Sequence, residues 1–244
     1  MSLRVLALVF VALATASAAK ADDWLPLRIG VFSSGSMMCS AFALTKTKAL
    51  VHAQCYSMMP MDIRVRPAGI PLSDSGDIYY ANRIVYHPDR DYKKQQNEFA
   101  IVTLDREIKT ENDQKLPTIA KSGSTPTAGQ TCNSIQKIYS TTSSMYNGGV
   151  DMKHISLKVI DSAQCASSCG TSFTSDFICA EVTTSNDSSY PMYQPDNGSP
   201  LVCGKEIFGI ATPEIYCSSN LSTPSSAVFA YRKIASLGDF VRQE

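Results

Sequence analysis

The sequence of 244 residues has little of what metal, nucleic-acid or membrane proteins need. It has three histidines and no paired Cys-x-x-Cys set, so we expect no zinc site and no cofactor. Basic and acidic residues number 22 each, which gives no reason to expect a nucleic-acid or anionic-membrane partner. No apolar run reaches the ~20 residues that a membrane-spanning helix needs. We therefore expect no membrane span.

The first residues are typical of a secretory signal peptide. Arg4 gives a basic start, Val5–Ala14 is apolar, and small residues follow. We expect residues 1–21 to be a signal peptide and residues 22–244 to form one secreted, extracellular domain. Cleavage would remove Arg4 and Lys20 and no acid, which leaves 20 basic against 22 acidic residues and a net charge of −2.

Eight cysteines lie in the expected mature part. An even count behind a signal peptide favours four disulfides over a metal site. The cysteines are Cys39, Cys55, Cys132, Cys165, Cys169, Cys179, Cys203 and Cys217.

Short β-type runs recur between Gly, Pro, Ser and Asn residues, which is typical of an all-β barrel or sandwich. The polar stretch Lys109–Gln130 is predicted to connect two halves. In the tail Tyr231–Val241, Ile234, Leu237 and Val241 share one face of a predicted helix. The expected strands are Leu27–Phe32, Ser40–Leu44, Ile63–Pro67, Asn82–Tyr86, Phe99–Leu104, Ile135–Ser140, His154–Ile160, Phe177–Val182, Leu201–Cys203, Ile207–Ala211 and Ala227–Tyr231.

Several segments, taken in order, resemble motifs of the trypsin-like serine protease family. They are Met38–Leu44, Ala49–Cys55, Ile84–Pro88, Asn97–Ile101, Asp176–Ala180 and Gln194–Cys203. The resemblance covers essentially the whole mature chain. It implies two packed six-stranded antiparallel β-barrels with a catalytic cleft between them, and the tail adds a C-terminal helix.

The resemblance also implies the disulfides Cys39–Cys55, Cys132–Cys203 and Cys165–Cys179. The family's cysteine before the loop aspartate is missing, since Tyr193 stands nearest that place. Cys217 thus lacks its usual partner, and Cys169 is extra. We predict a Cys169–Cys217 bridge; the alternatives are a free thiol pair or an intermolecular bridge.

The resemblance places the catalytic triad at Gln54, Glu98 and Asn197. The amide of Gln54 cannot accept a proton as histidine does, and Asn197 has no hydroxyl to activate. Pro195 matches a glycine whose N–H stabilises the oxyanion, and proline has no N–H. We therefore expect no catalysis.

Other residues are not expected to replace the missing nucleophile and base. No base is placed for Ser199 as a displaced nucleophile, and His52 should be packed or at the surface. The family's Ile-Val-Gly-Gly start, whose amine pairs with the loop aspartate, is absent. We expect the loop of Asp196 to be rearranged, or its charge to be satisfied by another cation or by solvent.

The specificity pocket differs from that of trypsin. Pro191 matches its acidic base, and Thr212-Pro213-Glu214 matches the edge strand that pairs with substrate, where Pro213 weakens pairing. An aromatic-rich group surrounds them and either plugs the pocket or forms a protein-binding surface. Its members are Tyr190, Met192, Tyr193, Ile215 and Tyr216.

Three glycosylation sequons start at Asn186, Asn197 and Asn220. A glycan on Asn197 would cover the former active-site cleft.

Together these features predict a monomeric, secreted, non-catalytic protease homologue. It would act as a cofactor, decoy or adaptor for secreted proteins, such as active serine proteases or their substrates, in seminal or another secreted fluid. The alternatives are an active or residually active serine endopeptidase and a small-ligand carrier.

Overall fold

The structure is a computed structural model that describes residues 27–33, 36–56, 62–67, 77–93, 97–109, 116–139, 150–170, 173–183, 195–212, 217 and 227–242. Some predicted features lie outside these residues: the signal peptide 1–21, the sequons at Asn186 and Asn220, and the pocket residues Tyr190, Pro191, Met192, Tyr193, Pro213, Glu214, Ile215 and Tyr216.

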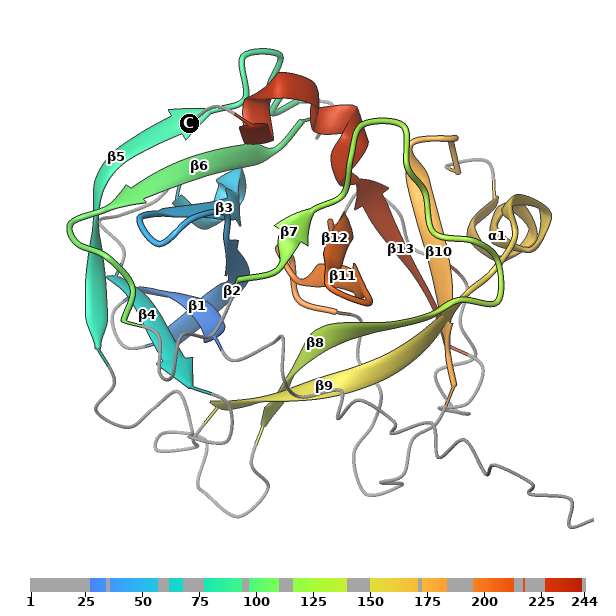
Figure 1. Cartoon of the computed structure of the whole chain (residues 1–244), viewed down its shortest axis with the longest axis horizontal. Helices are drawn as coiled ribbons and strands as arrows, with labels where there is room; N and C mark the ends of the chain where they lie inside the picture. The colour runs from blue at the N-terminus through green and yellow to red at the C-terminus, as the bar shows by residue number, and fades with distance from the viewer. Residues whose placement is uncertain are drawn as a thin grey trace, which may run out of the picture.

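The N-terminal half is a closed six-stranded barrel with strand order β1-β2-β3-β6-β5-β4 (Figure 1). Inward-facing apolar residues alternate along its strands, as Ile29 and Val31 do on β1, and fill the interior. The strands are β1 (Leu27–Ser33), β2 (Ser36–Ala43), β3 (Lys48–His52), β4 (Asp62–Pro67), β5 (Ile78–Tyr86) and β6 (Phe99–Leu104).

The C-terminal half is a seven-stranded sheet with strand order β11-β8-β9-β10-β13-β12-β7. Strand β11 also pairs with β12, so the sheet curls round on itself. The strands are β7 (Thr118–Ile119), β8 (Thr131–Tyr139), β9 (Val150–Val159), β10 (Phe177–Val182), β11 (Pro200–Cys203), β12 (Glu206–Ala211) and β13 (Val228–Lys233). The all-β fold with two packed halves is confirmed. The short parallel strand β7, inside the predicted connector, makes this half differ from a plain six-stranded barrel.

A hydrophobic core joins the two halves. Side chains of β2, β3 and β6 meet side chains of β8, β11 and β12, and side chains of the C-terminal 3-10 helix (Ile234–Arg242) join the same cluster. Figure 1 shows this helix at the C-terminal end of the chain, in red. The tail was predicted to be helical from Tyr231, but β13 continues to Lys233. The spacing of Ile234, Leu237 and Phe240 by three residues suits a 3-10 helix, which has three residues per turn. The buried residues of this core are Phe42, Leu50, Phe99, Ile101, Ile135, Val202, Ile207, Ile210, Ile234, Leu237, Phe240 and Val241.

One α-helix, α1 (Ser162–Cys169), precedes β10 and carries two cysteines. Asp161 caps it by accepting a hydrogen bond from the Gln164 N–H at 2.8 Å. Cys165 and Cys169 lie four residues apart, on one buried face. The structure has the disulfides Cys39–Cys55, Cys132–Cys203, Cys165–Cys179 and Cys169–Cys217, the same pairs that were expected from the sequence.

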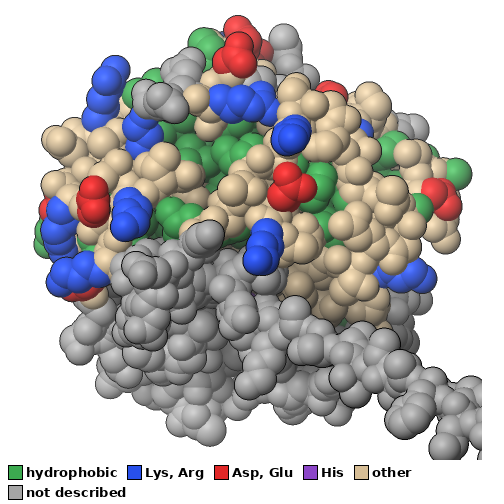
Figure 2. All heavy atoms as spheres, viewed as in Figure 1, with side chains coloured by type: hydrophobic (Ala, Val, Ile, Leu, Met, Phe, Trp, Pro, Cys, Tyr) green, Lys and Arg blue, Asp and Glu red, His purple; other side chains and the backbone are tan. Residues whose placement is uncertain are grey.

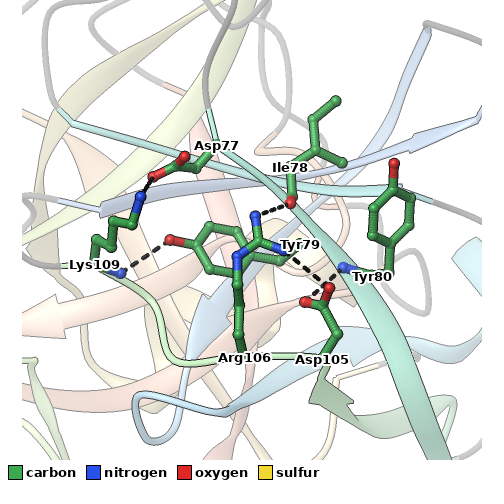
Figure 3. A network of polar contacts seen from close by, with 7 residues as sticks. All are labelled: Asp77, Ile78, Tyr79, Tyr80, Asp105, Arg106 and Lys109. Atoms are coloured by element: carbon green, nitrogen blue, oxygen red, sulfur yellow. Dashed lines mark hydrogen bonds and ion pairs between the residues drawn. The ribbon is translucent and has the colours of Figure 1, made fainter.

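A polar network fixes the segment after β6 to the start of β5 (Figure 3). Asp105 accepts hydrogen bonds from the Tyr80 N–H at 3.2 Å and from Arg106 Nη1 at 2.9 Å. The Arg106 guanidinium lies over the Tyr79 ring at 4.5 Å, and the Tyr79 hydroxyl accepts from the Lys109 N–H at 3.0 Å. These contacts hold the end of the first barrel where the connector to the second half begins.

Charged side chains of both signs are mixed over the coloured part of the face in Figure 2, with hydrophobic side chains between them. No helix among the described residues is long and apolar enough to cross a membrane.

Removing the Cys169–Cys217 bridge should destabilise the fold. The bridge closes a segment of 48 residues, and the double substitution Cys169→Ala/Cys217→Ala should lower the free energy of unfolding by about 4 kcal/mol. Urea unfolding of the parent and the variant measures the difference. An unchanged midpoint would show that this bridge adds no stability.

Candidate functional site

The structure brings the three predicted triad positions to the joint between the two halves. Gln54 lies in the 3-10 turn Ala53–Tyr56 after β3, and Glu98 directly precedes β6. The Ala53 N–H donates to the Glu98 carbonyl at 2.8 Å, so these two segments lie side by side. The Asn197 carbonyl accepts from the Ser40 N–H of β2 at 3.0 Å, which joins the loop of the second half to the first barrel.

The loop around Asn197 is a tight turn that requires glycine at 198. The Ser199 N–H donates to the Asp196 carbonyl at 2.9 Å, and the Gly198 N–H donates to the Ala211 carbonyl at 2.9 Å. Gly198 has φ +91°, a conformation that favours glycine, and a Cβ there would lie 2.0 Å from the Ser40 carbonyl oxygen. The loop is therefore fixed against β2 by its backbone.

Glu98, the predicted carboxylate position of the triad, forms an ion pair with Arg90. Its side chain is 1% exposed. Arg90 Nη2 lies 2.9 Å from Oε2 of Glu98, and Arg90 Nε donates to the same oxygen at 3.0 Å. A buried carboxylate is tolerated when a cation and hydrogen bonds compensate its lost hydration. The carboxylate of Glu98 is thus held by a residue of the preceding loop.

Arg90 also contacts two surface tyrosines. Its guanidinium carbon lies 4.7 Å from the centre of the Tyr86 ring and 5.9 Å from that of Tyr92. In the described part of the chain the exposed large hydrophobic residues are Tyr80, Tyr86 and Tyr92, on β5 and the loop after it. We call Tyr86, Arg90 and Tyr92 the tyrosine surface. Its arginine links it directly to the buried Glu98.

His52 is packed in the interior. Of the two placements expected from the sequence, packed or at the surface, the first is observed. It is 0% exposed, and its ring meets the Phe99 ring edge-on at 6.1 Å between centroids. Burial, helped by the nearby charge of Arg90, lowers the pKa of His52 to about 4. An imidazole with so low a pKa is a weak base, and a substrate bound at the surface cannot reach it while it is fully buried.

Ser199 and Asp196 have different surroundings in the same turn. Ser199 is 0% exposed, so its hydroxyl does not face the surface. Asp196 is partly exposed, with one carboxylate oxygen shielded from solvent. That another cation or solvent satisfies Asp196 stays a prediction.

A small cavity of about 10 Å³ remains beside the loop, which is room for about one water molecule. Pro195 and Thr212, two positions singled out from the sequence, lie in its wall with the bridged Cys217. The other lining residues are Ala211, Val228, Phe229 and Ala230.

The described residues that come closest to a metal-ligand set are Cys165, Cys169 and Cys179, whose sulfur atoms lie within 4.8 Å of one another. All three are in disulfides. A disulfide sulfur has no thiolate to offer a metal, so this cluster is structural.

Sequence reasoning missed Arg90, Tyr86 and Tyr92. Arg90 precedes Glu98 by eight residues within a loop, where no strand or helix period links them. One signal was available in the sequence. Glu98 was expected at a buried position without a histidine next to it, and a buried carboxylate needs a cation nearby.

Comparison with known proteins gives one family and a set of similar folds. The family model described as Trypsin matches residues 15–234. "Trypsin alpha-4" of Lucilia cuprina is 24% identical over 191 residues, which cover 77% of this chain and 71% of that protein.

Several solved structures have a fold similar to that of this chain. "Neuropsin, a serine protease expressed in the limbic system of mouse brain" has a TM-score of 0.67 at 18% identity, with 91% of this chain and 95% of that chain covered. "Kallikrein-related peptidase 10 complex with Zn2+" has a TM-score of 0.64 at 19% identity and the same coverage. "Human heparin binding protein" has a TM-score of 0.66 at 15% identity, with 91% and 92% covered.

Substituting Gly198 should disturb the loop far more than substituting Gly204. Gly198→Ala places a methyl group against the Ser40 carbonyl and should cost more than about 2 kcal/mol. Gly204 has φ +66°, and a Cβ on it would meet nothing within 4 Å, so Gly204→Ala should cost only about 1 kcal/mol, for the backbone conformation. Chemical unfolding of both variants tests the contrast, and equal costs would contradict the close packing of the loop on β2.

Acid should weaken the fold through His52. The pKa of His52 is about 4 in the folded chain and 6.5 in the unfolded chain. Between pH 6.5 and pH 4 the unfolded chain therefore binds more protons at this residue than the folded chain does. The free energy of unfolding should therefore drop by about 3 kcal/mol between pH 6.5 and pH 4 because of this residue.

His52→Ala is the matched variant for this test. Its urea unfolding, measured across the same pH range, should lack the His52 contribution. If parent and variant lose stability in parallel, His52 does not carry the acid sensitivity.

Proposed function

The chain belongs to the trypsin family, and we propose that it is a secreted, non-catalytic member that binds other proteins as a cofactor, decoy or adaptor. The observation that carries the proposal is the ion pair between Glu98 and Arg90. In an active member the carboxylate at this position orients a histidine. Here the neighbouring position is Gln54, and the carboxylate has an arginine as its partner instead.

The other catalytic requirements support the same proposal. Asn197 offers no hydroxyl for acyl transfer, and Gln54 offers no base. Pro195 removes one backbone donor of the oxyanion site, and the loss of one such donor alone typically costs ~10²–10³ in rate. Ser199, the neighbouring hydroxyl, is fully buried. A residual endopeptidase would need a nucleophile from outside this turn.

The tyrosine surface is the binding region that we propose. Tyr and Arg are enriched among the residues that dominate binding energy at protein interfaces. Tyr92 is 63% exposed and Tyr86 is 39% exposed. Because Glu98 and the two rings hold Arg90, little side-chain entropy remains to be lost on binding. We propose a secreted protein partner, such as an active serine protease or its substrate, in seminal or another secreted fluid.

The cavity beside Pro195 is too small to hold a drug-sized ligand. Pockets that hold drug-sized ligands span roughly 300–1,000 Å³, whereas the cavity beside Pro195 has about 10 Å³. A carrier role would need space that the described residues do not provide there. Binding functions also occur on this fold, since one similar structure is titled "Human heparin binding protein".

A fluorophosphonate probe tests the absence of catalysis. Such a probe labels an activated serine, so the secreted protein should stay unlabelled under conditions in which trypsin is labelled to completion. Saturable labelling of any serine, with peptide hydrolysis to match, would overturn the non-catalytic assignment.

Substitution on the tyrosine surface tests the binding role. Tyr86→Ala/Tyr92→Ala should abolish crosslinking to a protein partner in the native fluid, because it removes both rings that flank Arg90. Tyr80→Ala is the control, since Tyr80 is 52% exposed on the same strand as Tyr86 and contributes no ring to Arg90. A partner that still crosslinks to the double variant as well as to the control binds elsewhere.

A further inference from the structure

We propose that Asn197 carries an N-linked glycan, attached before the chain folds and held in the folded protein at the former nucleophile position. The sequon is Asn197-Gly198-Ser199. The inference rests on the secretion that the proposed function includes, but not on which partner the protein binds.

The side chain of Asn197 is placed to carry a substituent. The residue is partly exposed. Its backbone carbonyl accepts from the Ser40 N–H, but its side-chain amide makes no hydrogen bond to another described residue. A sugar on the amide nitrogen would therefore break no hydrogen bond of the described fold.

The third residue of the sequon shows when the glycan must be added. The enzyme that attaches the glycan recognises the hydroxyl of the serine or threonine in this position, on a segment that it can reach. In the folded chain Ser199 is 0% exposed, and its backbone N–H and carbonyl bond to Asp196 and Ala211. Gly198 is pressed against the Ser40 carbonyl oxygen. The folded loop cannot present its serine, so transfer precedes folding.

The reaction is a glycosyl transfer from a lipid-pyrophosphate-linked oligosaccharide. The Asn197 amide nitrogen forms a bond to the anomeric carbon of the first sugar and loses a proton. The bond between that carbon and the pyrophosphate oxygen breaks, and the lipid pyrophosphate leaves. No oxidant or reductant is needed.

After folding, the glycan would stand over the joint between the two halves, because the Asn197 loop is hydrogen-bonded to β2 of the first barrel and to β12 of the C-terminal sheet. A bulky, hydrated glycan there would keep macromolecules away from Gln54 and the small cavity. The tyrosine surface, on β5 and the loop after it, would be left as the accessible contact region.

Peptide mapping of the protein secreted from a eukaryotic host tests occupancy. Release of N-glycans by the amidase PNGase F in ¹⁸O-water converts an occupied asparagine into ¹⁸O-labelled aspartate. Because an Asn-Gly pair also deamidates spontaneously, a parallel digest in ¹⁸O-water without PNGase F gives the background, and only label above that background counts. We expect this label at Asn197 in most molecules. An unlabelled Asn197 in folded, secreted protein would overturn the proposal, whatever the state of Asn186 and Asn220.

Two variants separate the glycan from folding. Ser199→Ala deletes a buried hydroxyl that has no hydrogen-bond partner among the described residues, so the variant should be secreted and folded with one glycan fewer. Asn197→Gln keeps a side-chain amide but removes the asparagine to which the glycan would be attached. Both should show the same loss of mass on a gel, and a parent whose mass equals theirs would contradict the assignment.

A second experiment tests the order of events. Aglycosyl protein, refolded after expression in bacteria, is offered to purified oligosaccharyltransferase with its lipid-linked donor, beside a synthetic peptide of residues 194–203. We expect the peptide to be modified at a rate at least tenfold above that of the folded protein. Equal rates would show that the folded loop does present Ser199, and would overturn the proposed order.

Discussion

The carboxylate of Glu98, which is 1% exposed at the joint between the two halves, needs a compensating positive charge, and the neighbouring residues supply it. Glu98 is at the head of β6, where the backbone is fixed by the Ala53 N–H, so it cannot move out to solvent. Without a compensating cation its charge would cost several kcal/mol, and Arg90 supplies that cation with two contacts to one oxygen. The Arg90 guanidinium in turn lies against the rings of Tyr86 and Tyr92. One electrostatic requirement thus connects the interior of the joint with the outer surface of the first barrel.

The same joint explains how the family's fold forms with Gln54, Glu98 and Asn197 at the predicted triad positions. Twelve buried apolar residues from both halves and from the C-terminal 3-10 helix pack across it, and this packing does not involve the triad positions. The Asn197 loop remains fastened to β2 and β12 through backbone hydrogen bonds, which are independent of side-chain identity at 197. The loop can therefore keep its place with an asparagine at position 197. Gly198 could not change in the same way, because its contact with Ser40 leaves no room for a side chain.

Most of the fold could be predicted from local patterns, and most of the site's new contacts could not. Phe177–Val182 was predicted with its observed bounds, because an apolar run between turn residues marks a buried strand. Strand β3 was missed as a strand, since its residues stand out only as part of a longer motif, and β7 is too short to leave a pattern. Helix α1 has a weak apolar period, although Asp161 and Gln164 form a recognisable start. The partnership of Arg90 with Glu98 depends on the path of a loop, which no period in the sequence encodes.

The measurement that tests the account most directly is a double-mutant cycle on Arg90 and Glu98. Urea unfolding at neutral pH is compared for the parent, Arg90→Met, Glu98→Gln and the double variant. If the carboxylate is now a structural group, Arg90→Met alone should cost about 3–5 kcal/mol, because it leaves a buried charge without its partner. The double variant should recover much of that loss, with a coupling energy of at least about 2 kcal/mol. Additive effects, with a coupling near zero, would contradict the claim that this ion pair holds Glu98 in place.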